Sequence, residues 1–121
     1  PVDVSTSAQA TIGGMTGNNS CGSRSIHYGN MVHNVLGIDA WLADGASYRF
    51  GALPENLEQL DAPQGYRDLV ASINAIVRRE AEEIEHRYPK VLRRVGGYNL
   101  DMVLPEGANM AHLLVGSEGT L

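Results

Sequence analysis

Two glycine-rich segments carry the residue types best suited to contact a ligand. The first, residues 11–25 (TIGGMTGNNSCGSRS), contains four glycines, two asparagines and three serines. Glycine lets the backbone approach a ligand closely, and successive backbone N–H groups can surround an anion such as a pyrophosphate. The side chains of Asn18, Asn19 and Ser20 add donors and acceptors for the hydroxyl groups or ring edge of a cofactor. The alternative is a glycine-rich surface turn, because neither GxGxxG nor GxxxxGK[ST] occurs here.

The second segment is residues 115–121, VGSEGTL. Its carboxylate, Glu118, lies between Gly116 and Gly119 and could accept hydrogen bonds from ribose hydroxyls or a ring N–H. The alternative is the C-cap of a preceding helix followed by a glycine turn. Either segment alone is therefore an ambiguous signal for binding.

The remaining reactive side chains predict no catalytic acid or base. His27 and His33 could bind a metal, but the four histidines lack the HExxH spacing, so surface or loop positions are the preferred interpretation. Cys21 could be a nucleophile or a point of covalent cofactor attachment, whereas a small packing residue is the preferred interpretation. We therefore predict no metal site.

The composition indicates a folded, acidic chain. The sequence has 121 residues, 43% hydrophobic and 19% charged, with a formal net charge of -5. The acidic balance argues against a nucleic-acid module, and the single cysteine excludes a disulfide scaffold. Nothing in the sequence approaches a membrane span of ~18 apolar residues, and we expect no signal peptide. Three arginines could bind a phosphate or carboxylate, although solvated surface charge is the preferred interpretation: Arg24, Arg93 and Arg94.

The pattern of apolar residues predicts the elements that position these segments. Residues 11–25 are expected to form turns with positive φ rather than a regular element. A strand is predicted within residues 34–43, with one face made by Leu36, Ile38, Ala40 and Leu42. Asp44-Gly45 then predicts a two-residue hairpin turn that places Trp41 opposite Tyr48.

The second half of the chain is predicted to be mainly helical. Apolar residues recur at steps of three and four over residues 65–88, which predicts one helix that Pro89 ends and that a Glu83–Arg87 pair supports. Shorter helices are expected at residues 54–60 and 107–114. One hairpin together with several helices favours the α+β class.

The order of these motifs resembles one family. TIGG-x-x-x-NNS-x-G, then Tyr28-Gly29, the hairpin sequence Leu-Ala-Asp-Gly and finally GSEGTL resemble the FAD-binding domain of the vanillyl-alcohol oxidase / p-cresol methylhydroxylase superfamily. Within this superfamily the sequence resembles the branch of FAD-linked oxidases that act on 2-hydroxy acids, such as glycolate oxidase FAD subunits, D-lactate dehydrogenases and D-2-hydroxyglutarate dehydrogenases. Residues 93–100, RRVGGYNL, resemble large members that also carry a C-terminal iron–sulfur domain. The resemblance implies an α+β second half of a PCMH-type FAD-binding domain, with a small antiparallel sheet and flanking helices.

The resemblance also assigns FAD-contacting residues. In such proteins the stretch that matches residues 5–11 leads into a Gly-Gly pair, and both this stretch and the later NNS and EGT motifs contact the cofactor. The residues implied here are Gln9, Ala10, Thr11, Gly13, Gly14, Asn18, Asn19, Ser20, Cys21, Gly22, Glu118, Gly119 and Thr120. No residue of this chain is assigned a catalytic role, because by the resemblance FAD itself accepts the hydride.

The resemblance further implies that residues 1–121 are one part of a longer enzyme. An upstream half with a pyrophosphate loop and a downstream substrate domain would complete an FAD-dependent oxidoreductase that oxidises a 2-hydroxy acid of the D-lactate, glycolate or D-2-hydroxyglutarate class. The chain alone would be inactive and would bind FAD weakly or not at all. We expect a cytoplasmic location, or association with a membrane through electron-transfer partners. Two alternatives are a non-catalytic ligand-binding or assembly module with a glycine-rich anion loop and, less favoured, a metal-dependent hydrolase.

Overall fold

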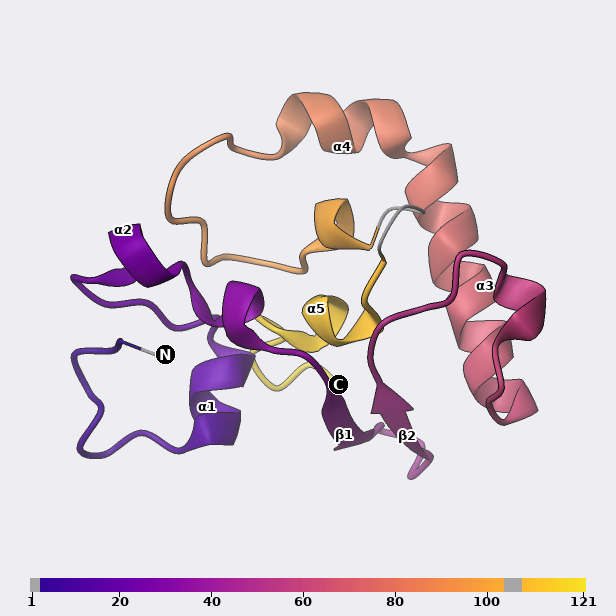
Figure 1. Ribbon diagram of the computed structural model, residues 1–121, viewed down its shortest axis with the longest axis horizontal. Coiled ribbons are helices and arrows are strands. Elements are labelled where there is room, and N and C mark those ends of the chain that lie inside the picture. The colour runs from indigo at the N-terminus through magenta and orange to yellow at the C-terminus, as the bar shows by residue number, and fades with distance from the viewer. Residues whose placement is uncertain (1–2, 104–107) are drawn as a thin grey trace.

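The protein is described by a computed structural model that covers residues 3–103 and 108–121. Figure 1 shows α5 in the middle of the fold, with α3 along one side and α4 across the top. In chain order the elements are α1 (Ile12–Gly17), α2 (Ser25–Tyr28), η1 (Met31–Asn34), β1 (Ile38–Trp41), β2 (Ser47–Phe50), η2 (Leu57–Gln59), α3 (Gln64–Arg79), α4 (Ala81–Arg87), η3 (Leu100–Met102) and α5 (Met110–Leu114). The predicted α+β class with a small antiparallel sheet and flanking helices is confirmed.

The predicted hairpin forms, but its register differs by one residue from the prediction. Tyr48 pairs with Ala40, and Trp41 pairs with Ser47, so the expected Trp41–Tyr48 pair is wrong. Residues 43–45 form the loop, because the N–H of Leu42 donates to the Ala46 carbonyl at 2.8 Å. A three-residue loop needs a left-handed residue at its end, and the glycine at position 45 supplies it with a φ of 83°.

The alternation of exposed and buried side chains holds within β1 and fails before it. Ile38 and Ala40 are half-buried, whereas Asp39 and Trp41 are exposed. Leu36, which was expected on the same face, is 87% exposed because it precedes the strand. The strand signal over residues 34–43 therefore extended beyond the four residues that pair.

The single helix predicted over residues 65–88 is interrupted at Glu80, so that prediction is wrong. The Glu80 N–H donates to the Ile76 carbonyl and ends α3, while the Glu80 carbonyl accepts from Ile84 and begins α4. The bend brings Ile84 to Val77, which is fully buried in the same hydrophobic cluster. The predicted Glu83–Arg87 pair is present at 2.7 Å.

A short helix occupies part of the segment that was expected to lack regular structure. The Thr11 hydroxyl caps α1 by accepting from the Gly14 N–H at 3.0 Å, and Met15 anchors the helix in the core. The expected positive φ occurs at Asn19 (46°), not at the segment's glycines. The expectation was wrong because capping and burial outweighed the low helix propensity of glycine.

The C-terminal helix lies between the hairpin and the N-terminal elements. The Met110 N–H donates to the Gly51 carbonyl at 2.9 Å, which joins α5 to the end of β2. The helix predicted over residues 107–114 is observed as α5, and residue 107 lies outside the described residues. The short helix expected within residues 54–60 is observed as η2. Buried side chains from η1, the hairpin, α3 and the C-terminal part meet here, including Met31, Phe50, Tyr66, Met110 and Val115.

Candidate functional site

The two glycine-rich segments lie side by side although they are far apart in the sequence. The Gly116 N–H donates to the Thr16 carbonyl at 3.0 Å, and the Glu118 N–H donates to the Gly17 carbonyl at 2.9 Å. These two bonds attach the C-terminal loop directly to the end of α1. The structure thus brings together the two segments that the sequence singled out independently.

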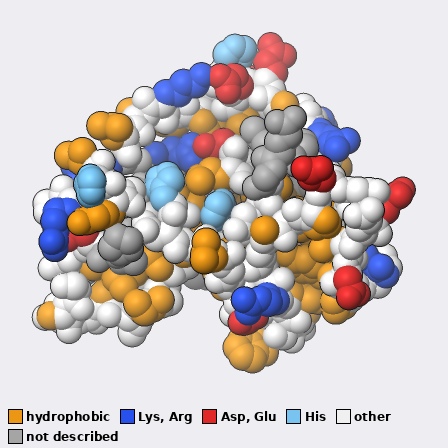
Figure 2. Space-filling view, viewed as in Figure 1, with side chains coloured by type: hydrophobic (Ala, Val, Ile, Leu, Met, Phe, Trp, Pro, Cys, Tyr) orange, Lys and Arg blue, Asp and Glu red, His pale blue; other side chains and the backbone are white. Residues whose placement is uncertain are grey.

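An open groove of about 640 Å³ runs beside this junction. Ile12 and Gly13 of α1 form one wall, Ile38 and Ala40 of the hairpin form another, and Leu121 lies at the C-terminal side. Figure 2 shows the surface hollowed between the N-terminal part and the hairpin. This volume is within the range of small-molecule and cofactor pockets.

Several residues predicted to contact the cofactor are exposed around α1. Gln9, Thr11, Gly13, Gly14 and Asn18 are all exposed. A Cβ built on Gly13 would meet no atom within 4 Å, so a ligand can approach its backbone. The Gly14 N–H is already used, since it donates to the Thr11 hydroxyl. Ala10 is half-buried.

The NNS motif turns inward after Asn18. The side chain of Asn19 is fully buried; its Oδ1 accepts from the Val32 N–H at 3.0 Å, and its Nδ2 donates to the Arg94 carbonyl at 3.3 Å. The Asn19 side-chain amide therefore joins the loop to residues 32 and 94 and does not face the groove. Ser20, Cys21 and Gly22 are half-buried.

The glycine at position 22 is required by close packing. A Cβ there would lie 2.2 Å from the backbone oxygen of Asp3. Asp3 also accepts from the Arg24 backbone N–H, and its carboxylate pairs with the Arg24 guanidinium at 3.4 Å. The structure therefore gives Gly22 a packing role against the N-terminal residues.

Arg94 lies in a polar network rather than on the surface. Its guanidinium donates to Asn99 Oδ1 at 3.0 Å and to Asp101 Oδ1 at 2.7 Å, and it stacks over the Tyr88 ring at 4.5 Å from the centroid. Its side chain is only 18% exposed, so the preferred interpretation as solvated charge was wrong for this arginine. The Arg94 carbonyl also accepts from Asn30 Nδ2 at 2.8 Å.

The same network reaches the C-terminal loop through Asn99. This buried side chain donates from Nδ2 to the Val115 carbonyl at 2.7 Å and to the His112 carbonyl at 3.2 Å. Together with the bond from Asn19 to the Arg94 carbonyl, these contacts link the first glycine-rich segment to the second through residues 94–99. Sequence reasoning missed this link, because nothing in the residue spacing indicates which carbonyls the asparagines reach.

The residues of the EGT motif form an exposed turn. Glu118 has a φ of 50° and Gly119 a φ of 78°, and both residues are exposed. The Thr120 hydroxyl donates to the Ser117 carbonyl at 2.6 Å and contacts the Tyr98 hydroxyl. The turn is held by the local bond to Ser117, by the contact with Tyr98 and by the bond from the Glu118 N–H to the Gly17 carbonyl, and the Glu118 residue is exposed.

The histidines and Cys21 do not assemble into a metal centre. Within residues 3–103 and 108–121, no group of three His, Cys, Asp or Glu side chains is placed to hold a metal ion. His33 Nδ1 accepts from the Asn30 N–H at 2.9 Å, and the His27 ring packs edge-on against Tyr28. Cys21 is a free, half-buried thiol.

His112, on α5, is more buried than the sequence suggested. Burial lowers its pKa below the usual value, while its contact with the Val35 carbonyl at 3.2 Å favours the charged form and opposes this shift. The His112 imidazole is therefore neutral near neutral pH, and its contact with the Val35 carbonyl joins α5 to the segment before β1.

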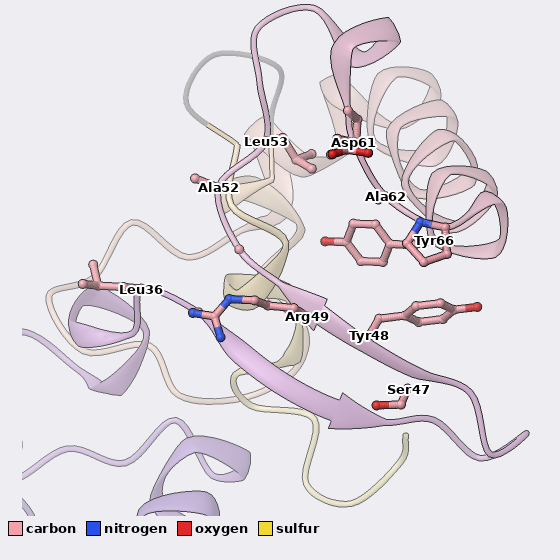
Figure 3. Close-up of a pocket in the computed structure, with 13 residues that line it drawn as sticks. Leu36, Ser47, Tyr48, Arg49, Ala52, Leu53, Asp61, Ala62 and Tyr66 are labelled. Carbon is pink, nitrogen blue, oxygen red and sulfur yellow. The ribbon is translucent and has the colours of Figure 1, made fainter.

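A second groove of about 490 Å³ lies across the hairpin, next to the start of α3. Figure 3 shows Tyr48, Arg49, Asp61 and Tyr66 around it. Burial raises the pKa of Tyr66, and its hydrogen bond with the Gly51 backbone opposes this shift. None of the residues predicted to contact the cofactor lines this groove, whereas Gly13 is the one member of the predicted set that lines the first. We therefore assign the candidate site to the first groove.

Comparison with known proteins defines the class. Residues 1–51, which include the first glycine-rich segment, match the family described as FAD binding domain. The part of the chain that holds the first glycine-rich segment is thus similar to an FAD-binding domain, the class that its motifs predicted.

The relatives found by sequence carry one name. The chain is 33% identical over 126 residues to D-2-hydroxyglutarate dehydrogenase of Pantoea ananatis, 31% over 126 residues to that of Escherichia coli and 30% over 127 residues to that of Haemophilus influenzae. Each alignment covers 98% of the chain but only 12% of the relative's length. No solved structure gives a significant match. Among residues 3–103 and 108–121, no helix has the length and apolar character needed to cross a membrane.

Proposed function

We propose that this chain supplies FAD-contacting loops to an FAD-dependent oxidoreductase that oxidises a 2-hydroxy acid of the D-lactate, glycolate or D-2-hydroxyglutarate class. The observation that carries the proposal is the junction of the two glycine-rich segments beside one open groove. The names of the relatives favour a 2-hydroxyglutarate-type substrate. The chain spans about an eighth of their length, so the substrate site belongs to other parts of the enzyme.

The residues present fit a dinucleotide cofactor. The groove is bordered by Gly13, whose backbone is open to approach, and the neighbouring turn exposes Glu118. In this proposal the backbone around Gly13 and Gly14 lies against FAD, while Glu118 and Thr120 contact its polar edge. When bound, FAD supplies the acceptor for the substrate hydride. The chain's own contribution is to bind and orient the cofactor, and we assign it no catalytic acid or base.

The buried residues of the NNS motif act indirectly in this proposal. The side-chain amide of Asn19 is hydrogen-bonded to the backbones of Val32 and Arg94. In this proposal it supports the backbone of Ser20 and Cys21 and does not contact FAD with its side chain. Gln9, Ala10, Thr11, Asn18 and Gly22 complete the proposed set at the rim and base of the first segment. In this proposal the exposed Asn18 lies at the rim of the site, and the buried Asn19 supports the loop from below.

The cofactor site is shared with the rest of the enzyme in this proposal. Residues 1–121 form one part of the FAD-binding domain, an upstream part contributes the pyrophosphate loop, and a downstream domain binds the substrate. An iron–sulfur cluster in a further domain would carry electrons onward. We place the enzyme in the cytoplasm, with membrane association through electron-transfer partners as the alternative.

The test compares the 121-residue chain with the protein as it is encoded, including its flanking regions. The encoded protein should purify with the flavin absorption band near one FAD per chain and should oxidise D-2-hydroxyglutarate, D-lactate or glycolate with an artificial electron acceptor. The 121-residue chain should retain little or no FAD after dialysis. Absence of FAD and of 2-hydroxy acid oxidation in the encoded protein would refute the function. Tight stoichiometric FAD in the short chain would refute only the shared site.

A further inference from the structure

The Thr120 hydroxyl is fully oriented by its neighbours. Its oxygen lies 2.6 Å from the Ser117 carbonyl, which can only accept, so the single Thr120 proton is used there. The Tyr98 hydroxyl contacts the same oxygen and must therefore donate its own proton to Thr120. A hydroxyl oxygen accepts two hydrogen bonds, so one acceptor position and no donor remains on Thr120.

Tyr98 is itself held in place. Its carbonyl accepts from the Tyr88 hydroxyl at 2.8 Å, and the same Tyr88 ring lies under the Arg94 guanidinium. The next residue, Asn99, is buried and bonded to the Val115 carbonyl. Tyr98 thus extends from a braced backbone to the exposed turn at residues 117–120.

We propose that Tyr98 is a positioning residue that makes Thr120 an obligatory hydrogen-bond acceptor toward the cofactor. This inference rests on the proposed function and adds to it the direction of one hydrogen bond, from the cofactor to Thr120. The cofactor atom that meets Thr120 must be a donor, which means a ring N–H or a ribityl or ribose hydroxyl. The pyrophosphate is excluded at this position, because its oxygens are ionised at neutral pH and only accept.

The direction of this hydrogen bond depends on one phenolic proton. In Tyr98→Phe the ring keeps its shape, but Thr120 loses its donor partner, and its hydroxyl can turn away from Ser117. The oxygen then no longer presents a fixed acceptor to the cofactor. Thr120→Val removes the acceptor directly and leaves Tyr98 unchanged, whereas Thr120→Ser keeps the hydroxyl.

The experiment uses the encoded protein with its flanking regions and measures the FAD dissociation constant, the absorption spectrum of bound FAD and the melting temperature. Tyr98→Phe and Thr120→Val should each weaken FAD binding by about 3- to 10-fold, as expected for one net hydrogen bond, and should shift the flavin bands. The double variant should lose no more FAD affinity than the single variant that binds FAD less tightly, because both changes remove the same interaction. Thr120→Ser should retain the wild-type spectrum. Tyr28→Phe is the matched control, since Tyr28 is an exposed tyrosine on α2.

The outcomes separate this inference from the proposed function. A wild-type protein without FAD refutes the proposed function. A wild-type protein with FAD whose Tyr98→Phe variant keeps the same affinity and spectrum refutes the role of Tyr98. Additive losses in the double variant also refute it. If Tyr98→Phe does not fold, equal FAD affinity in Thr120→Val and Thr120→Ser refutes a hydrogen bond between Thr120 and the cofactor, and with it the role of Tyr98.

Discussion

Replacing Arg94 by methionine should destabilise the fold far more than the same change at the adjacent Arg93. Methionine keeps an unbranched apolar side chain over the Tyr88 ring but removes the guanidinium. The variant therefore lacks the hydrogen bonds to Asn99 and Asp101 and the cation–π contact with Tyr88. Arg93 is exposed and makes one longer bond, to the Gly22 carbonyl at 3.2 Å.

The magnitude follows from the burial of these groups. Leaving a buried hydrogen-bond partner unsatisfied costs about 1–3 kcal/mol, and an exposed cation–π contact contributes about 0.5–1 kcal/mol. Asp101 is 31% exposed, so water recovers part of the loss on that side. We therefore expect Arg94→Met to lower the free energy of unfolding by about 2–3 kcal/mol and Arg93→Met by less than about 1 kcal/mol.

The assay is thermal unfolding followed by circular dichroism in the absence of FAD. For a domain of this size, about 4 °C of melting temperature corresponds to 1 kcal/mol, so Arg94→Met should melt about 8–12 °C lower than the wild type. Arg93→Met should lie within about 4 °C of it. Equal shifts for the two variants would show that the network around Arg94 does not support the fold, and the link between the two glycine-rich segments would lose its physical basis.

Two further predictions concern single positions of the framework. Gly116→Ala should destabilise the fold by more than about 1 kcal/mol, because the residue has a φ of 89° and a Cβ would lie 2.9 Å from the Gly97 carbonyl; Gly13→Ala, which meets no atom within 4 Å inside α1, should leave the melting temperature unchanged or raise it. Equal losses in both variants would contradict the assigned geometry. The lowered pKa of His112 predicts that stability falls as the pH drops below about 6.5, because the unfolded chain then binds a proton that the half-buried imidazole of the folded chain resists. Denaturant midpoints measured between pH 7.5 and 5 should show this decline, and it should be smaller in His112→Gln; an unchanged pH profile in that variant would rule out His112 as the cause.

The elements could be predicted where local signals and tertiary packing agree. The hairpin has alternating apolar residues and an Asp44-Gly45 turn, and its existence was predicted correctly. Its register was not, because the same dipeptide suits a two-residue or a three-residue loop, and the packing of Phe50 and Ile38 selects between them.

In the predicted helix over residues 65–88, local signals and tertiary packing disagree. Val77 and Ile84 are seven residues apart, which is two helical turns, so the periodicity continues through the break at Glu80. The bend becomes necessary only because Val77 and Ile84 must both pack against Val103 in one cluster. A contact with a residue that far along the chain leaves no mark on the local pattern.

The sequence by itself carried the resemblance to an FAD-binding domain, because a resemblance depends on the order and spacing of the motifs and needs no folded context. It also indicated the hairpin and the helical second half through their periodicity. Only the tertiary structure decided which members of the NNS motif face outward, that Arg94 is half-buried in a polar network, and that the Tyr98 hydroxyl contacts that of Thr120. The physical reason is that hydrogen-bond partners and burial depend on neighbours brought from distant parts of the chain, whereas residue type and spacing record only the near ones.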